Sequence, residues 1–182
     1  MRRTLVGVIA LFLAAVAVAA DPPTGYKLEK TIPIKGDGGW DYLTVDSAAR
    51  RVYVSHATVV EVLDADTGEL RGQIPDTAGV YGIAVAADLG RGFTSNGRAD
   101  TVTAFDLKTL KRLASIKTAK NPDAILYDPS TERVFAFNGN SKRVTVIDAT
   151  DDNVVARIDL GGKPEGTATD ETGHVRVLVF GK

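Results

Sequence analysis

Two series of polar residues recur along this chain at a nearly constant interval. The first series is mostly acidic, with members 40, 42 and 42 residues apart: Asp41, Tyr81, Asp123 and Glu165. The second carries imidazole and amide side chains at intervals of 40 and 42 residues: His56, Asn96 and Asn138. Carboxylate and amide oxygens are ligands for hard cations such as Ca²⁺, which takes roughly six to eight of them. The two series therefore predict a site for a cation or a small polar ligand, if the fold brings them together.

A structural role competes with this interpretation. Asn and His side chains also cap turns, and acidic side chains also tie down the edges of a sheet. Trp40, the only tryptophan, directly precedes Asp41 and either faces a ligand or seals the end of the fold. His56 and His174 are the only histidines, and their separation does not match a metal-binding pair.

Several kinds of chemistry are absent from the sequence. There are no cysteines, which excludes disulfides, thiolate metal sites and cysteine nucleophiles. No Gly-x-Ser-x-Gly elbow, His-Glu-x-x-His motif or phosphate loop occurs. Lys and Arg number 22 against 23 Asp and Glu, so the net charge of −1 disfavours non-specific binding to nucleic acid.

Residues 1–20 have the pattern of a secretory signal peptide. Arg2 and Arg3 precede an apolar run from Leu5 to Val18, and Ala17-Val18-Ala19 supplies small residues for cleavage before Ala20 or Asp21. The alternative is an uncleaved anchor, but the run is short for a membrane span of about 20 residues. Cleavage would leave 20 basic and 23 acidic residues, a net charge of −3. We expect the mature chain, residues 21–182, to be periplasmic or secreted, with no membrane attachment.

Beyond the signal peptide, the whole sequence repeats about every 42 residues. One set of aspartates has intervals of 42, 40 and 42 residues, and another has intervals of 42 and 42; the sets are Asp46, Asp88, Asp128 and Asp170, and Asp64, Asp106 and Asp148. An Arg followed two residues later by an aromatic residue also recurs, as in Arg51-Val52-Tyr53. We interpret the aspartates as turn residues that accept backbone N–H groups. The aromatic residues are expected in the core: Tyr53, Phe93 and Phe135.

Each repeat contains four short runs with the alternation of β-strands. In the third repeat the runs are 124–127, 133–138, 143–147 and 153–158, separated by clusters of turn-forming residues. No segment after residue 20 shows a sustained helical period. Four strands in a repeat of 40–45 residues are typical of a propeller blade. The sequence therefore predicts an all-β fold, a β-propeller of four-stranded blades.

The second strand of each repeat resembles the Tyr-Val-Thr-Asn pattern of the YVTN-family β-propeller repeats. It reads Tyr53-Val54-Ser55-His56, Phe93-Thr94-Ser95-Asn96 and Phe135-Ala136-Phe137-Asn138, and the resemblance extends over about residues 26–177. Proteins with this repeat include periplasmic proteins of the YncE type and surface-layer proteins, and they resemble the large chain of quinoprotein amine dehydrogenases. The resemblance implies a ring that usually closes with seven blades.

The chain is expected to hold about three and a half blades, half of a seven-bladed ring. Complete blades are expected at about 40–75, 80–117 and 122–159, with a partial blade at 164–182 and an isolated outer strand at 26–34. In the partial blade, Val175 and Val177 replace the Arg and the aromatic residue of the earlier repeats. Either the chain is truncated, or it completes its ring by associating with itself or another chain.

In a propeller, the loops that enter the first strands and those that join the second and third strands lie on one face, around the channel. The two polar series should therefore meet at the channel mouth, where loops on a rigid scaffold usually carry function. The candidate ligand-binding residues are Trp40, Asp41, His56, Tyr81, Asn96, Asp123, Asn138 and Glu165. No cofactor is expected, apart from a Ca²⁺ ion at the mouth as one hypothesis.

The leading functional prediction is an exported binding or interaction scaffold without a catalytic motif, whose partner is a protein or a small polar ligand. The alternative is an enzyme: a remnant of a propeller hydrolase or lactonase, or of a quinoprotein dehydrogenase-like subunit, with a metal or a quinone at the mouth. Nucleic acid binding is suggested only by the resemblance to the YncE type, and the negative net charge weighs against it.

Overall fold

The computed structural model describes residues 25–181, so the expected signal peptide at 1–20 lies outside the described residues. The chain divides into two compact units, Met1–Pro33 and Ile34–Lys182. The described part of the first unit, residues 25–33, contains no helix or strand. The expected outer strand at 26–34 is therefore wrong. An outer strand pairs with the third strand of a blade, and every described third strand already has a fourth strand of its own.

The second unit contains three four-stranded antiparallel sheets, each built from consecutive strands. The first comprises β1 (Trp40–Asp46), β2 (Arg51–His56), β3 (Val59–Asp64) and β4 (Leu70–Ile74). The second comprises β5 (Val80–Ala86), β6 (Arg91–Asn96), β7 (Thr101–Asp106) and β8 (Arg112–Lys117), with a 3₁₀ turn, η1 (Ala87–Leu89), after β5. The third comprises β9 (Pro122–Asp128), β10 (Arg133–Asn138), β11 (Arg143–Asp148) and β12 (Val154–Asp159).

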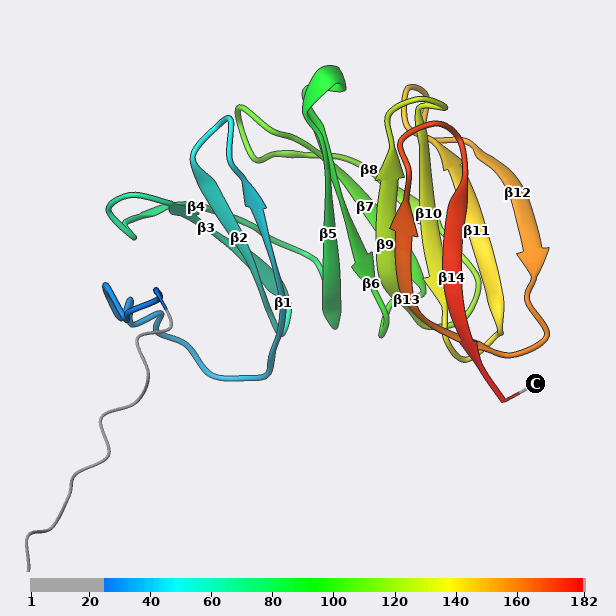
Figure 1. Cartoon of the computed structure of the whole chain (residues 1–182), viewed down its shortest axis with the longest axis horizontal. Coiled ribbons are helices and arrows are strands. Elements are labelled where there is room, and N and C mark those ends of the chain that lie inside the picture. Colours follow the sequence, from blue (N-terminus) through cyan, green and yellow to red (C-terminus); the bar gives the residue numbers. More distant parts are fainter. Residues whose placement is uncertain (1–24, 182) are drawn as a thin grey trace, which may run out of the picture. The chain divides into compact units, whose positions relative to one another are not determined.

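A fourth sheet has two strands, β13 (Lys163–Thr169) and β14 (Val175–Phe180). The first strands of the four sheets, β1, β5, β9 and β13, lie side by side in this order, as Figure 1 shows. Consecutive sheets that place their first strands together are the blades of a propeller. The predicted fold class, an all-β propeller with about three and a half blades, is confirmed.

The repeat holds the same register in each complete blade. The last residue of each first strand lies opposite the arginine that begins the second strand, as in Asp46↔Arg51, Ala86↔Arg91 and Asp128↔Arg133. The arginines of the first two blades reach across to the next blade. Arg51 donates to the Leu107 carbonyl, and Arg91 donates to the carbonyl oxygens that follow β11 and to Asp152.

Aspartates close the turns between the strands, as predicted for most of them. The Asp106 carboxylate accepts hydrogen bonds from the Thr109 amide and hydroxyl, and Asp148 accepts the same pair from Thr150. Asp88 is an exception to this interpretation. It lies in η1, two residues beyond the end of β5, and accepts a hydrogen bond from the Tyr127 hydroxyl at 2.8 Å instead of a backbone amide.

The core lies between neighbouring blades. Tyr53 and Phe105 pack between the first and second blades, and Phe93 packs with Val134 and Ile147 between the second and third. The expected core aromatics Tyr53 and Phe93 are fully buried. Phe135 is half-buried and packs against the cluster around Phe137, between the third blade and the partial blade.

Candidate functional site

The four first strands all begin at one end of the sheets, which we call the mouth. Near that end each first strand is irregular against its second strand, with register shifts at Trp40/Leu43, at Val80/Ile83, between Pro122 and Ile125, and at Pro164/Thr167. An irregularity of this kind bends a strand and re-aims its side chains. The acidic series lies within these irregular segments, as the second or third residue of its strand. The sequence had placed it just before the strands.

The acidic residues of the mouth act on one another electrostatically. Burial raises the pKa of Asp123, and the charges of Asp41 and Glu165 raise it further, while Lys163 opposes them. Partial desolvation also raises the pKa of Asp41. These carboxylates from three different blades therefore share one region of negative potential.

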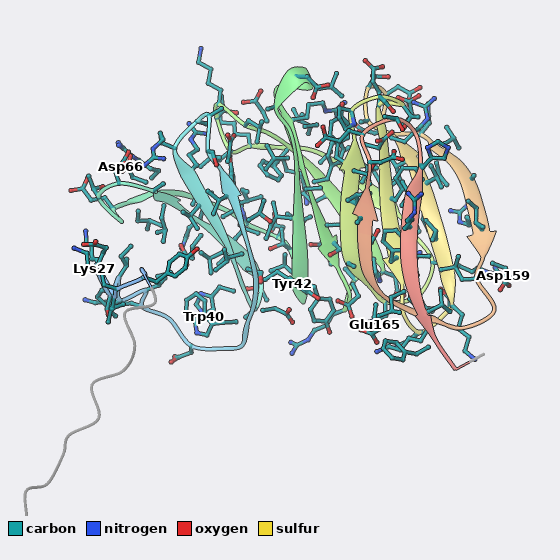
Figure 2. The ribbon with its side chains drawn as sticks, in the orientation of Figure 1. Lys27, Trp40, Tyr42, Asp66, Asp159 and Glu165 are labelled. Carbon is teal, nitrogen blue, oxygen red and sulfur yellow. The ribbon has the colours of Figure 1, made fainter. Side chains whose placement is uncertain are left out.

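Tyr42 lies in the same field. Burial raises the pKa of its phenol, and the charges of Asp123, Asp41 and Glu165 then add to the effect. Figure 2 shows Tyr42, Trp40 and Glu165 along the same edge of the molecule, at the beginning of the first strands. Glu165 is paired with Lys163 on its own strand. The charge of Lys163 therefore partly offsets those of Glu165 and Asp123.

A pocket of about 300 Å³ opens between the first strands of all four blades. Its walls are mostly apolar, and its polar side chains include Tyr42 and Glu165. The lining residues are Tyr42, Thr44, Gly82, Ile83, Ala124, Ile125, Leu126, Glu165, Gly166 and Thr167. The mouth thus combines an acidic rim with an apolar interior, which suits a positively charged group on an apolar stem.

A second pocket of about 200 Å³ lies at the mouth between the first two blades. It brings together three residues that the sequence had singled out, Trp40, Asp41 and Tyr81, and adds Arg98 from the loop between β6 and β7. The remaining lining is backbone and small side chains: Gly38, Gly39, Ala57, Gly79 and Val80.

His56 lies beneath this pocket and does not line it. Its ring stacks on Trp40 with centroids 3.8 Å apart and planes 8° apart. Nδ1 lies 3.5 Å from a carboxylate oxygen of Glu61, which also accepts hydrogen bonds from Gln73. Gly36 lies against the Cε1 edge of the imidazole, where a Cβ would come within 2.2 Å of the ring and where φ is +139°. His56 therefore supports Trp40 from below.

Asn96 and Asn138 are fully buried inside their blades. The Asn96 amide donates to Thr101 and Thr103, and its oxygen accepts from Thr94. The Asn138 amide donates to two carbonyl groups and to Thr145. For these two residues the contacts support the structural interpretation, the bracing of the second strand against the third, and neither residue lines a described pocket.

Between residues 25 and 181, no three carboxylate or imidazole side chains are grouped so that they could hold a metal ion. The predicted Ca²⁺ site therefore stays a prediction that only metal titration tests. Sequence reasoning missed Tyr42, Arg98 and Lys163. Tyr42 follows Asp41 directly, and no periodic signal marked it. Arg98 and Lys163 lie near the polar series but have no equivalents at the repeat interval.

The geometry defines a class of protein, a partial β-propeller with an acidic mouth. Residues 11–174 match the model of the YNCE-like beta-propeller family, and the chain belongs to that family. No curated protein sequence matches it significantly.

Solved structures share the fold at low sequence identity. Hydrazine synthase from Kuenenia stuttgartiensis is similar at 18% identity and a TM-score of 0.63, over 72% of this chain and 39% of that one. The RRP9 WD40 repeats and U3-55K are each similar at 10% identity and a TM-score of 0.63, over 69% of this chain and 40% and 41% of theirs. The chain thus spans about two fifths of these structures, and the likeness concerns the fold alone. In the described part of the chain, no helix has the length and hydropathy to cross a membrane.

Proposed function

We propose that this chain is an exported β-propeller binding scaffold whose mouth receives a positively charged group of a protein or a small polar ligand. The observation that carries the proposal is the position of Asp123: it is partly buried, and it lies near Asp41 and Glu165 of two other blades. Burial raises the pKa of Asp123, and the charges of these two carboxylates raise it further. Perturbed carboxyl groups beside a pocket are typical of functional sites. The mostly apolar pocket next to them would hold the stem that carries the charge.

Export is supported by the signal-peptide pattern of residues 1–20. Fractionation of cells that express the full chain, followed by N-terminal sequencing, tests it. Material from the periplasm should begin at Ala20 or Asp21. Recovery of intact Met1 in the membrane fraction would contradict export.

The binding role is tested by calorimetric titration of residues 21–182 with a tetralysine peptide. We expect binding that weakens with salt, because the partner charges are at the surface. Asp123→Asn should weaken it about two- to fivefold, the value of one partly screened charge pair. Asp159→Asn is the matched control, since Asp159 lies on an outer strand away from Trp40 and Glu165 (Figure 2).

Two further titrations complete the test. Tetraglutamate should not bind, and equal binding of both peptides would overturn the proposal, as would an Asp123→Asn variant with unchanged affinity for tetralysine. CaCl₂ tests whether the cation is a metal ion: a ligand of the native state raises the melting temperature. A rise in the parent that is lost in Asp123→Asn would assign the mouth to Ca²⁺, and the absence of any rise would end the Ca²⁺ hypothesis.

A further inference from the structure

The pocket between the first two blades has a composition that the acidic mouth as a whole does not. Within about 200 Å³ it brings together an aromatic ring, a carboxylate and a guanidinium group, those of Trp40, Asp41 and Arg98. We propose that this pocket binds a small aromatic zwitterion of the amino-acid type, with the ring on Trp40, the ammonium group at Asp41 and the carboxylate at Arg98. This inference deepens the proposed function, because the pocket is part of the same mouth.

Trp40 is built as a stacking platform. It is 44% exposed although one ring face is covered by His56, so the other face is open to a ligand. His56 is itself fixed by Glu61 and by the close approach of Gly36. A ring that enters the pocket would extend the existing pair into a three-layer stack, the offset-stacked arrangement that aromatic side chains favour.

The two charges of the pocket are available for a ligand. Arg98 is exposed and forms no ion pair with any residue in the described range 25–181. Gly79, at a φ of +66°, makes room for its stem, since a Cβ there would lie 2.5 Å from Arg98 Cγ. Desolvation raises the pKa of Asp41, and within residues 25–181 its carboxylate forms no ion pair. A ligand with both an ammonium and a carboxylate group would supply the missing partner to each.

The pocket is smaller than the roughly 300–1,000 Å³ of sites for drug-sized ligands, which favours a ligand the size of an amino acid. Tyr81 forms one wall of the pocket. Its ring packs against Gly97, which leaves room for it, because a Cβ at Gly97 would lie 2.3 Å from Tyr81 Cε2. The aromatic character of two walls selects an aromatic side chain over an aliphatic one.

The test uses the fluorescence of Trp40, which is the only tryptophan and so reports on this pocket alone. The mature chain is titrated with L-phenylalanine, phenethylamine and 3-phenylpropionate, which carry both charges, the ammonium alone and the carboxylate alone. We expect a saturable change with phenylalanine, and half-saturation at about tenfold higher concentration for each of the other two, since each lacks one charge-assisted hydrogen bond.

The variants assign each charge to its residue. Arg98→Gln should make phenylalanine and phenethylamine bind equally, and Asp41→Asn should do the same for phenylalanine and 3-phenylpropionate. Arg112→Gln and Asp159→Asn, which change residues outside the pocket, should behave as the parent does. The inference is overturned if phenylalanine gives no saturable change, if phenethylamine binds as well as phenylalanine in the parent, or if Arg112→Gln has the same effect as Arg98→Gln.

The outcomes also separate this inference from the proposed function. If tetralysine binds at the mouth and phenylalanine does not bind, the zwitterion site is wrong and the cation-binding role stands. If neither binds, both are wrong.

Discussion

Replacing Asp123 by asparagine should make the protein more stable at neutral pH. Asp123 is half-buried, and the charges of Asp41 and Glu165 act on it, with only Lys163 in opposition. Its pKa is raised, so folding favours the protonated carboxyl, and the ionised form that exists at pH 7 costs stability. Asparagine has the same shape without the charge. After allowance for solvent screening, we expect a gain of about 0.5–1 kcal/mol in the free energy of unfolding.

The pH dependence gives the sign of the effect. A carboxyl group whose pKa is raised on folding contributes stability that is present at low pH and is lost as the pH rises through its pKa in the folded protein. The side chain of the asparagine variant does not ionise, so its stability does not change with pH for this reason. Its advantage should therefore be absent below about pH 3, where the parent carboxyl is protonated in both states, and appear above the ordinary pKa of about 4. High salt should reduce it.

Urea unfolding followed by circular dichroism at a series of pH values measures this difference directly. Asp128→Asn is the control of opposite sign. Burial raises the pKa of Asp128, but hydrogen bonds from Thr131, Thr169 and Ser130 outweigh burial and leave the pKa lowered. Replacing the Asp128 carboxylate by an amide should lower the free energy of unfolding by about 1–3 kcal/mol at pH 7. The difference should shrink as the pH falls through the pKa of Asp128. A less stable Asp123→Asn at pH 7, or a gain that persists at pH 3, would refute the reasoning.

Three further predictions concern the blades. Arg91→Ala should lower the free energy of unfolding, measured in urea, by about 2–4 kcal/mol, because it leaves a largely buried carboxylate and two carbonyl groups without their donor. Arg133→Ala removes an ion pair within one blade and should lower it by less than about 1 kcal/mol. Equal losses would contradict the role of Arg91 between blades. His56→Asn should lower the free energy of unfolding by about 1–3 kcal/mol. Adding Glu61→Thr should restore most of this loss, because the pair then matches the Asn–Thr pairs of the next two blades. Simple additivity of the two substitutions in a double-mutant cycle would argue against this pairing. The mature chain should self-associate in light scattering, because β1 and β14 expose large apolar side chains, and Leu178→Glu should reduce the association; a clean monomer at high concentration would show that these faces are self-sufficient.

The strand pattern was predictable because every blade repeats the same local signals. The sequence predicts the second strand of the third blade at 133–138, and β10 spans Arg133–Asn138. The partial blade was expected at 164–182, and its first strand, β13, begins at Lys163. Pro164 and Gly166 are poor strand residues, so their extended conformation follows from pairing with β14 and packing against β9, which local propensity does not record.

The site was predictable only in part. Spacing placed both polar series at the same end of the blades, but it did not show which side of the strand each residue faces. A shift of one residue moves a side chain to the opposite face, and the register shifts near the mouth make that distinction impossible from period alone. Asn96 and Asn138, at the ends of their second strands, lie inside their blades, whereas Asp41 and Tyr81, on first strands, line a pocket.

The structure sorts the carboxylates into two groups with opposite energetic roles. The turn aspartates Asp106 and Asp148 recur with the same residue type, and hydrogen bonds, first of all from threonine hydroxyls, lower their pKa, so their charge stabilises the fold. Among the described residues, the aspartates whose pKa is raised are Asp41 and Asp123, both at the mouth. At the same position of the repeat the second blade carries Tyr81, so the fold does not require an acid there. Charges that the fold neither needs nor favours, contributed by separate blades at the mouth, are the pattern that supports the proposed binding role.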